Sequence, residues 1–274
     1  MGAPGTLQTT VVIPVWDAYV ADRLIDAVRS LREQDVQTRI IVVDNASQVA
    51  LPMLPGVSVV RSRARLSLGA ARNLGLARVS TPYAIFWDAD DVMLPGTLAS
   101  LQSAIAADPG LIAFGEAIIE DPPGRRHRWP RPWIARLTRR PRLFAVLDAV
   151  WSMYPTTGAT IMRADMVRDA GGYADSDSGE DWCLGVGLAF RGRLGWSERP
   201  GRIYRMHAGS VWAQHMTARH LLAHAAVVRE RLRHDQAVPG WARRLLPLIQ
   251  LGQYTALFAH QLVVLSRRLA GTRR

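Results

Sequence analysis

The sequence predicts an α/β fold, in which a mostly parallel sheet is flanked by helices and followed by a C-terminal helical extension. Between Thr9 and Ile119, short β-branched runs alternate with stretches whose apolar residues recur at helical spacing. This alternation is typical of a parallel sheet covered by helices. From Trp212 onward the pattern is helical, with one break at Pro239–Gly240. We therefore expect a domain over residues 1–210 and an extension over residues 211–274.

Each element of the alternating region follows from its own pattern. Apolar, β-branched runs predict four strands, at Thr10–Val15, Ile40–Val43, Val57–Val60 and Tyr83–Trp87. Helical spacing predicts three helices, at residues 20–31, Leu66–Val79 and Leu98–Ala107. We expect Asp17 to cap the first of these helices.

The pattern changes in the second half of the domain. Residues 121–142 carry eight arginines, five prolines and two tryptophans, which predicts a long basic loop that can include a short helix. Residues 153–173 predict a strand, a helix and a Gly-Gly turn, and residues 180–191 predict a further helix.

Length and composition limit the classes of protein that the chain can belong to. Its 274 residues suffice for one α/β domain with an appendage. A hydrophobic fraction of 49% and a mean hydropathy near zero exclude a disordered, collagen-like or multi-span membrane protein. The single cysteine, Cys183, excludes an intramolecular disulfide and a multi-cysteine zinc site. We therefore expect a cytoplasmic location.

The charge balance indicates the kind of partner. The chain has a formal net charge of +11, and all 34 of its basic residues are arginine. Such a charge favours polyanionic partners, which are anionic lipid headgroups, nucleic acid or nucleotide diphosphates. Exclusive use of arginine is also typical of GC-rich bacterial genomes, so part of the charge reflects coding bias.

Carboxylates follow two of the predicted strands directly. Asp44 comes after the second strand and Asp88 after the fourth, and ligands of open α/β sheets bind at the carboxyl ends of strands. Asp90 and Asp91 complete a cluster with Asp88, and clustered carboxylates repel one another unless a cation neutralises them. Hard divalent cations prefer oxygen ligands, so we infer a metal site. The alternative is a helix cap and turn before residues 92–95.

Two further motifs contain groups that could do chemistry. Glu180 and Asp181 open a predicted helix, where a carboxylate could be a general base or a simple cap favoured by the helix dipole. His207 lies near the end of the domain, where it could be a metal ligand or an ordinary structural histidine.

Taken in order, these motifs resemble glycosyltransferase family 2, whose members have the nucleotide-diphospho-sugar-binding GT-A fold. The resemblance spans roughly residues 9–210 and rests on seven segments, which are Val11–Val15, Val42–Ser47, Gly69–Asn73, Asp88–Asp91, Gly171–Tyr173, Glu180–Trp182 and Tyr204–Ser210.

The resemblance implies roles for individual residues of the donor and acceptor sites. Pro14 and Asp44 would hold the base and ribose of the nucleotide, and Arg72 would contact an anion. Asp88 would contact the ribose or the sugar, and Asp90 and His207 would bind the metal. Asp181 would be the catalytic base. Asp91 and Glu180 are further candidates. Oxygen ligands with one imidazole suit Mn²⁺ or Mg²⁺.

We therefore expect an inverting, metal-dependent glycosyltransferase. Its donor would be a nucleotide-diphospho-sugar, with UDP as the expected nucleotide, and its acceptor a hydroxyl of a cell-envelope glycan, a lipid or a secondary metabolite. One alternative is a non-enzymatic binder of polyanions or membrane surfaces, although the carboxylate cluster disfavours nucleic acid. A second alternative is a sugar-nucleotide nucleotidyltransferase, although residues 15–18 lack the Gly-rich basic loop of that class.

Two segments raise the question of a membrane or a second copy of the chain. The arginines and tryptophans of residues 125–142 suit a membrane interface, a phosphorylated acceptor or a solvated loop. Leu245–Ser266 has no formally charged residue over 22 positions. It could pack on its own domain or form a homodimer, lie in an anionic membrane interface, or span the bilayer. Interfacial binding would place the protein at the inner face of the membrane.

Overall fold

The computed structural model describes residues 9–20, 22–107, 112–120, 124–205 and 217–271. Its main sheet has seven strands in the order β10-β6-β9-β4-β1-β2-β3. These strands are β1 (Thr9–Val15), β2 (Arg39–Asp44), β3 (Ser58–Arg61), β4 (Tyr83–Phe86), β6 (Ile112–Phe114), β9 (Thr160–Arg163) and β10 (Leu194–Trp196). Only β9 runs antiparallel to its neighbours, β4 and β6, so the prediction of a mostly parallel sheet is confirmed.

A second sheet of four strands lies beside the main one, in the order β5-β11-β7-β8. Its strands are β5 (Val92–Met93), β7 (Ala117–Glu120), β8 (Arg126–Trp129) and β11 (Arg202–Arg205). The predicted basic loop is therefore wrong in part, because β8 pairs with β7 and two helices follow, α4 (Ile134–Leu137) and α5 (Pro141–Val150). The four residues of β8 show no apolar alternation, so their pairing with β7 was not visible in the sequence.

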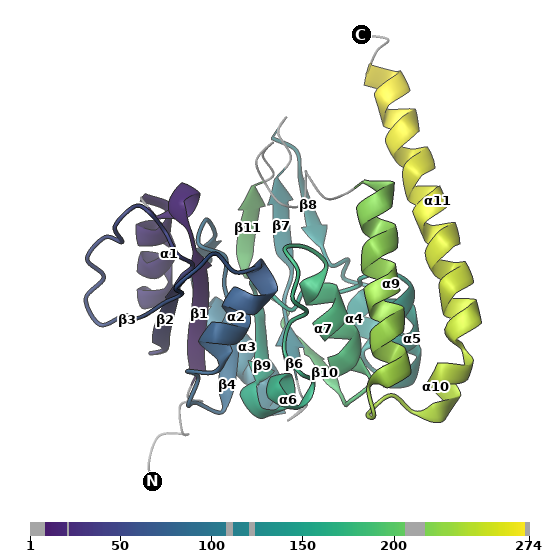
Figure 1. The fold of residues 1–274 in the computed structure, drawn as a ribbon, viewed down its shortest axis with the longest axis horizontal. Coiled ribbons are helices and arrows are strands. Elements are labelled where there is room, and N and C mark those ends of the chain that lie inside the picture. Colours follow the sequence, from purple (N-terminus) through teal and green to yellow (C-terminus); the bar gives the residue numbers. More distant parts are fainter. Residues whose placement is uncertain (1–8, 21, 108–111, 121–123, 206–216, 272–274) are drawn as a thin grey trace.

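Helices cover both faces of the main sheet (Figure 1). They are α1 (Asp22–Arg32), α2 (Leu68–Leu76), α3 (Thr97–Ala107), α6 (Ala164–Asp169) and α7 (Glu180–Ala189). Helices α1 and α3 share one apolar core with Val11 and Ile13, whereas α2, α6 and α7 share another with Val12. This division follows from the alternation of side chains along β1.

The prediction for Asp17 is wrong. Asp17 begins a short 3₁₀ helix, Asp17–Tyr19, and the carboxylate caps neither this helix nor α1. Its Oδ1 instead accepts hydrogen bonds from the backbone N–H groups of Gln48 and Val49, at 2.5 and 3.0 Å. Asp17 therefore fixes the loop that follows β2, and Asp44 is the last residue of β2.

The C-terminal extension consists of helices, as predicted, within its described residues. They are α9 (Ala218–His234), α10 (Gly240–Arg244) and α11 (Leu246–Gly271). A third core joins α9 and α11 to α5 and α7, and includes Trp182, Val186, Val228 and Leu232. Figure 1 shows α11 along the outer edge of the molecule, with its C-terminal end extending past α9.

The structure decides part of the question about residues 245–266. One face of α11 packs on the domain, through buried Ile249 and Gln253. Within the described part of the chain, no helix has both the length and the apolar character that a membrane span requires. The division at residue 210 remains a prediction, because residues 206–216 lie outside the described residues.

The shared core predicts that the extension stabilises the domain. Leu232→Ala removes a fully buried side chain, so we expect it to lower the free energy of unfolding by about 2–5 kcal/mol. Leu222→Ala, on the same helix but 40% exposed, is the matched control and should cost less than about 0.5 kcal/mol. Urea unfolding measures both variants, and equal losses would show that α9 does not share the core.

Candidate active site

Two motifs that lie 100 residues apart in the sequence form one structural unit at α2. The Asn73 Nδ2 group donates to the carbonyl of Tyr173 at 2.8 Å, and the backbone N–H of Tyr173 donates to Asn73 Oδ1 at 2.9 Å. Gly172 precedes this contact with φ of +69°, and a Cβ there would overlap the Asn73 amide. Gly69 likewise lets the carbonyl of Ala174 approach the helix, where a Cβ would overlap it. The two motifs are therefore joined by hydrogen bonds, and they can approach this closely only because Gly69 and Gly172 have no side chain.

The loop after Tyr173 completes this unit by capping α2. Ser67 Oγ accepts from the backbone N–H of Ala70 at 3.1 Å and donates to Asp175 Oδ1 at 2.5 Å. Asp177 Oδ1 accepts from the backbone N–H of Leu68 at 2.9 Å. Carboxylates at a helix N-terminus accept hydrogen bonds from the free N–H groups there, and the helix dipole stabilises their negative charge. The loop is thereby held against α2 just before it enters α7.

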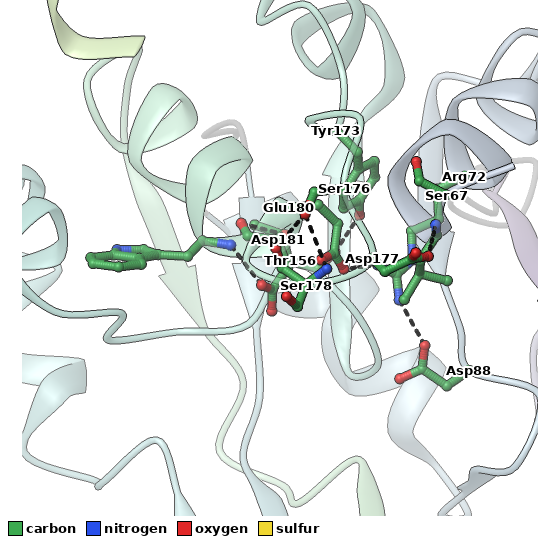
Figure 2. A network of polar contacts seen from close by, with 12 residues as sticks. Ser67, Arg72, Asp88, Thr156, Tyr173, Ser176, Asp177, Ser178, Glu180 and Asp181 are labelled. Carbon is green, nitrogen blue, oxygen red and sulfur yellow. Dashed lines mark hydrogen bonds and ion pairs between the residues drawn. The ribbon is translucent and has the colours of Figure 1, made fainter. Parts of the chain in front are cut away.

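Arg72 lies under this unit and connects two carboxylates. Its side chain is 2% exposed, and its Nη2 lies 2.9 Å from Asp88 Oδ1, while Nη1 pairs with Glu180. The guanidinium also lies 5.3 Å from the centroid of the Tyr173 ring. Figure 2 shows Arg72 between the start of α7 and Asp88. A single arginine therefore joins the carboxyl end of β4 to the first turn of α7.

A second buried arginine, Arg202 on β11, extends the connection. It donates to Asp88 Oδ2 at 3.1 Å and pairs with Asp91. Its guanidinium fits closely against Gly158, where a Cβ would lie 2.6 Å from Cζ. Carboxylates and arginines thus alternate in a buried ion chain, which consists of Glu180, Arg72, Asp88, Arg202 and Asp91.

Burial and charge set the protonation of the buried ion chain. Burial raises the pKa of Glu180 from 4.5 to about 7 although Arg72 opposes the rise. Burial likewise raises the pKa of Asp91 from 3.8 to about 7, against Arg202 and with the help of Asp88. At Asp88, burial is outweighed by Arg72 and Arg202, which lower its pKa. The central carboxylate is therefore fixed as an anion, and the two ends can take up protons near neutral pH.

Asp181 follows Glu180 but faces a different environment. Its side chain is half-buried, and Oδ1 accepts from the backbone N–H of Trp182 at 2.7 Å. Thr156 Oγ1 donates to the main-chain carbonyl of Asp181 at 3.0 Å, and the Tyr173 hydroxyl donates to the carbonyl of Thr156 at 2.7 Å. The Glu180 carboxylate is buried in an ion pair with Arg72, whereas the Asp181 carboxylate borders solvent. Of the two acids, Asp181 is the more exposed.

A third carboxyl group, Asp148 on α5, lies behind this turn. It is fully buried, its Oδ1 accepts from the backbone N–H of Met153 at 2.8 Å, and Oδ2 has no hydrogen-bond partner in the described structure. Burial raises its pKa well above the usual value, and the charge of Asp181 adds to the rise. Its main-chain carbonyl accepts from Trp182 Nε1 at 2.6 Å, which ties α5 to α7.

The residues expected to hold the nucleotide lie on neighbouring strands. Pro14 is buried in β1, and Asp44 ends β2 with Oδ1 accepting from the backbone N–H of Ser47 at 2.9 Å. Arg61 on β3 pairs with the other carboxylate oxygen of Asp44. Because β1 lies between β2 and β4, Asp44 and Asp88 belong to strands about 10 Å apart. They lie along one sheet edge, without direct contact.

The expected metal ligands are only partly within the described structure. Asp90 is 25% exposed, and its Oδ2 lies 3.8 Å from Arg23 Nη1. His207 lies outside the described residues. Within the described ranges, no group of three or more histidine, cysteine, aspartate or glutamate side chains could hold a metal ion.

The structure thus joins some of the predicted residues and adds others. Arg72, Asp88, Asp91 and Glu180 meet in the buried ion chain, and Asp181 adjoins it. Three charged residues were missed by the sequence analysis, namely Arg61, Asp148 and Arg202. A single arginine in a basic chain gives no signal of its own, and Asp148 resembles any polar residue of an amphipathic helix.

Comparison with known proteins identifies the class to which this fold and site belong. The family model for glycosyl transferase family 2 matches residues 10–169. The chain therefore belongs to glycosyltransferase family 2, and it is an enzyme that transfers sugar from a nucleotide-sugar. This assignment replaces the non-enzymatic and nucleotidyltransferase alternatives. A search of curated proteins finds no match.

Solved structures of S. aureus TarS are similar to this chain. TarS 1–349 in complex with UDP-GlcNAc is 15% identical, with a TM-score of 0.59, and the match covers 96% of this chain and 92% of that chain. The complex of TarS 1–349 with UDP is 17% identical, with a TM-score of 0.57 and the same coverage. The longer TarS structure is 14% identical, with a TM-score of 0.56, and the match covers 90% of this chain and 53% of that one. The shared fold is GT-A.

The raised pKa of Glu180 predicts how stability depends on pH. Between pH 4.5 and about 7 the folded chain keeps a proton on Glu180 that the unfolded chain has lost. The free energy of unfolding should therefore fall as pH rises through this window, and Asp91 acts in the same direction. In Glu180→Gln the fall between pH 5.0 and 7.5 should be smaller by roughly 2–3 kcal/mol.

Urea unfolding at both pH values tests this prediction. Glu33→Gln removes an exposed carboxylate and is the matched control, for which we expect the wild-type pH dependence. The lowered pKa of Asp88 acts only at more acidic pH, since its stabilisation is lost as pH falls below 3.8. An unchanged fall in Glu180→Gln would rule out Glu180 as the titrating group.

Proposed function

We propose that this chain transfers a sugar from a UDP-linked donor to a hydroxyl acceptor with inversion at the anomeric carbon. The observation that carries the proposal is the buried ion chain. It holds Asp88, at the donor edge of the sheet, in a fixed position relative to the first turn of α7, where Asp181 borders solvent. The TarS complexes with UDP and UDP-GlcNAc support UDP as the nucleotide.

The nucleotide would lie along the carboxyl ends of β1, β2 and β4. Pro14 and Asp44 would line the part of the site that takes the base and ribose, with Asp44 held by Arg61 and Ser47. Asp88 would contact the ribose or the sugar through a carboxylate that two arginines orient. Arg72 would act here by positioning Asp88, because its guanidinium is committed to Asp88 and Glu180.

Asp181 would be the general base. It would take the proton of the acceptor hydroxyl as that oxygen bonds to the anomeric carbon and the bond from this carbon to the diphosphate oxygen breaks. Attack from the face opposite the leaving group inverts the configuration in one displacement. The hydrogen bonds from Trp182 and Thr156 would hold the Asp181 carboxylate and its backbone in place during the transfer.

Asp90 and His207 would hold Mn²⁺ or Mg²⁺. The donor chemistry of the described part fits, because Asp90 is a partly exposed carboxylate beside Asp88, and such ions are bound through one or two protein ligands together with substrate phosphates. When bound, the cation supplies charge stabilisation for the departing diphosphate. The acceptor would be a hydroxyl of a cell-envelope glycan, a lipid or a secondary metabolite.

Asp181→Asn tests the proposed base. The variant keeps the size of the side chain but cannot accept a proton, so the release of UDP from UDP-GlcNAc should fall about 10² to 10⁴-fold with water as acceptor. Binding of UDP with Mn²⁺, measured by calorimetry, should be unchanged. Near-normal release would contradict the assignment, and loss of UDP binding would make Asp181 a donor-binding residue.

Asp90→Asn is the complementary variant for the donor site. It should weaken the binding of UDP in the presence of Mn²⁺, and the difference between titrations with and without Mn²⁺ should shrink. Asp26→Asn removes an exposed carboxylate from α1 and serves as the control. Equal UDP affinity for Asp90→Asn and wild type would remove Asp90 from the metal site.

A further inference from the structure

Helix α11 has an apolar surface that no other part of the described structure covers. Seven of its large hydrophobic side chains are 44–66% exposed. Six of them recur every three or four residues along one face of the helix, and Val263 adjoins that face. These residues, called the apolar stripe below, are Leu248, Leu251, Tyr254, Phe258, Leu262, Val263 and Leu265. The opposite face packs on the domain through Ile249 and Gln253, so the orientation of the stripe toward solvent is fixed.

The apolar stripe is long and carries no charge. From Leu248 to Leu265 it extends over about 26 Å of helix, and Leu245–Ser266 contains no arginine, aspartate or glutamate. Exposed apolar patches of soluble monomers seldom exceed a few hundred Å², and larger ones mark interaction surfaces. Figure 1 shows α11 at the outer edge of the molecule, where a broad flat surface could reach it.

Unpaired positive charge lies at the start of α5, on which α11 packs, and in the segment that precedes α5. The segment 124–142 contains eight arginines and no acidic residue. For five of these arginines the described structure shows no ion pair, and all five are exposed: Arg131, Arg136, Arg139, Arg140 and Arg142. The segment leads into α5, on which α11 packs through the hydrogen bond from Gln253 Nε2 to the carbonyl of Ala149, at 2.8 Å. Trp133, in the same segment, is 55% exposed.

The helices of the extension also carry a net positive charge. Residues 217–266 contain six arginines and only two acidic residues, Glu230 and Asp235. Asp235 is occupied by Arg191, at 2.6 and 2.8 Å. Arginine pairs flank the apolar stripe in the sequence, at positions 243–244 and 267–268. The stripe is thus an uncharged surface within a strongly basic end of the molecule.

We propose that the apolar stripe docks onto the surface of an anionic lipid bilayer. An uncharged helix face with basic surroundings and exposed aromatic residues is the pattern of helices that lie in the bilayer interface. Charge complementarity decides against a second copy of the chain, because dimerisation through α11 would bring two basic ends together, whereas anionic headgroups attract both. The helix would lie parallel to the membrane plane, with the stripe in the headgroup and upper acyl region.

Vesicle sedimentation tests the proposal with the full chain. We expect the protein to sediment with vesicles of 70% phosphatidylcholine and 30% phosphatidylglycerol at 50 mM salt. Binding to vesicles of phosphatidylcholine alone should be at least tenfold weaker, and 500 mM salt should weaken the binding to anionic vesicles. No binding to the anionic vesicles, or equal binding to both kinds, would overturn the proposal.

Two sets of variants separate the apolar and the electrostatic parts. Leu251→Ser/Phe258→Ser/Leu262→Ser removes three exposed side chains of the apolar stripe and should reduce binding at least tenfold. Its matched control changes three exposed apolar residues at the other end of the molecule, Val49→Ser/Met53→Ser/Val59→Ser, and should bind like wild type. Arg139→Gln/Arg140→Gln/Arg142→Gln should reduce binding and its salt dependence.

Folding and oligomeric state complete the test. Circular dichroism should show wild-type helix content in each variant, because every changed residue is exposed. Light scattering should show a monomer in the absence of vesicles. A dimer that the stripe variant converts to monomer would overturn the proposal in favour of a second copy, as would full vesicle binding by a folded stripe variant.

Discussion

The burial of Arg72 is the constraint on which the rest of the active site depends. A guanidinium that is 2% exposed is tolerated only when its charge is compensated, and here Asp88 and Glu180 pair with its two terminal nitrogens. These carboxylates come from the end of β4 and the start of α7, so the two ion pairs of one arginine fix the distance between the carboxyl end of β4 and the first turn of α7. Arg202 repeats the arrangement on the other side of Asp88 and leaves that carboxylate little freedom.

Packing around Arg72 explains why small residues occur where they do. Gly69 and Gly172 allow the loop of residues 172–178 to lie directly on α2, so Arg72 is sealed from water between that loop and the sheet. The extension reinforces this closure, because His224 on α9 contacts Ser178 at 2.8 Å and packs on Gly179, one residue before α7. The C-terminal helices therefore support α7 on one face, while their other face is exposed in the described structure.

Much of the fold could be predicted from the sequence, because the strands of the main sheet are apolar runs and its helices have clear periodicity. Asp44 and Asp88 could be assigned to strand ends for the same reason. The strand at Arg126–Trp129 was missed because its pairing with β7 is a tertiary effect. The family resemblance favoured Asp181 over Glu180 as the base, but the ion pair between Glu180 and Arg72 could not be predicted, since only the structure shows which of two adjacent acids faces that arginine. Arg202 was missed because its partners are more than 100 residues away.

A double-mutant cycle on Arg72 and Glu180 tests most directly whether this buried pair organises the site. The free energies of unfolding of wild type, Arg72→Met, Glu180→Gln and the double variant would be measured in urea at pH 8, where Glu180 is mostly ionised. Arg72→Met strands buried carboxylates without their cation and should cost about 3–5 kcal/mol. Glu180→Gln removes a charge that burial disfavours and keeps an oxygen that can accept from Arg72, so it should cost less. The double variant should lose at least about 1 kcal/mol less than the two single losses together. Losses that add to within about 0.5 kcal/mol would show that the two side chains do not depend on each other, and would contradict the account.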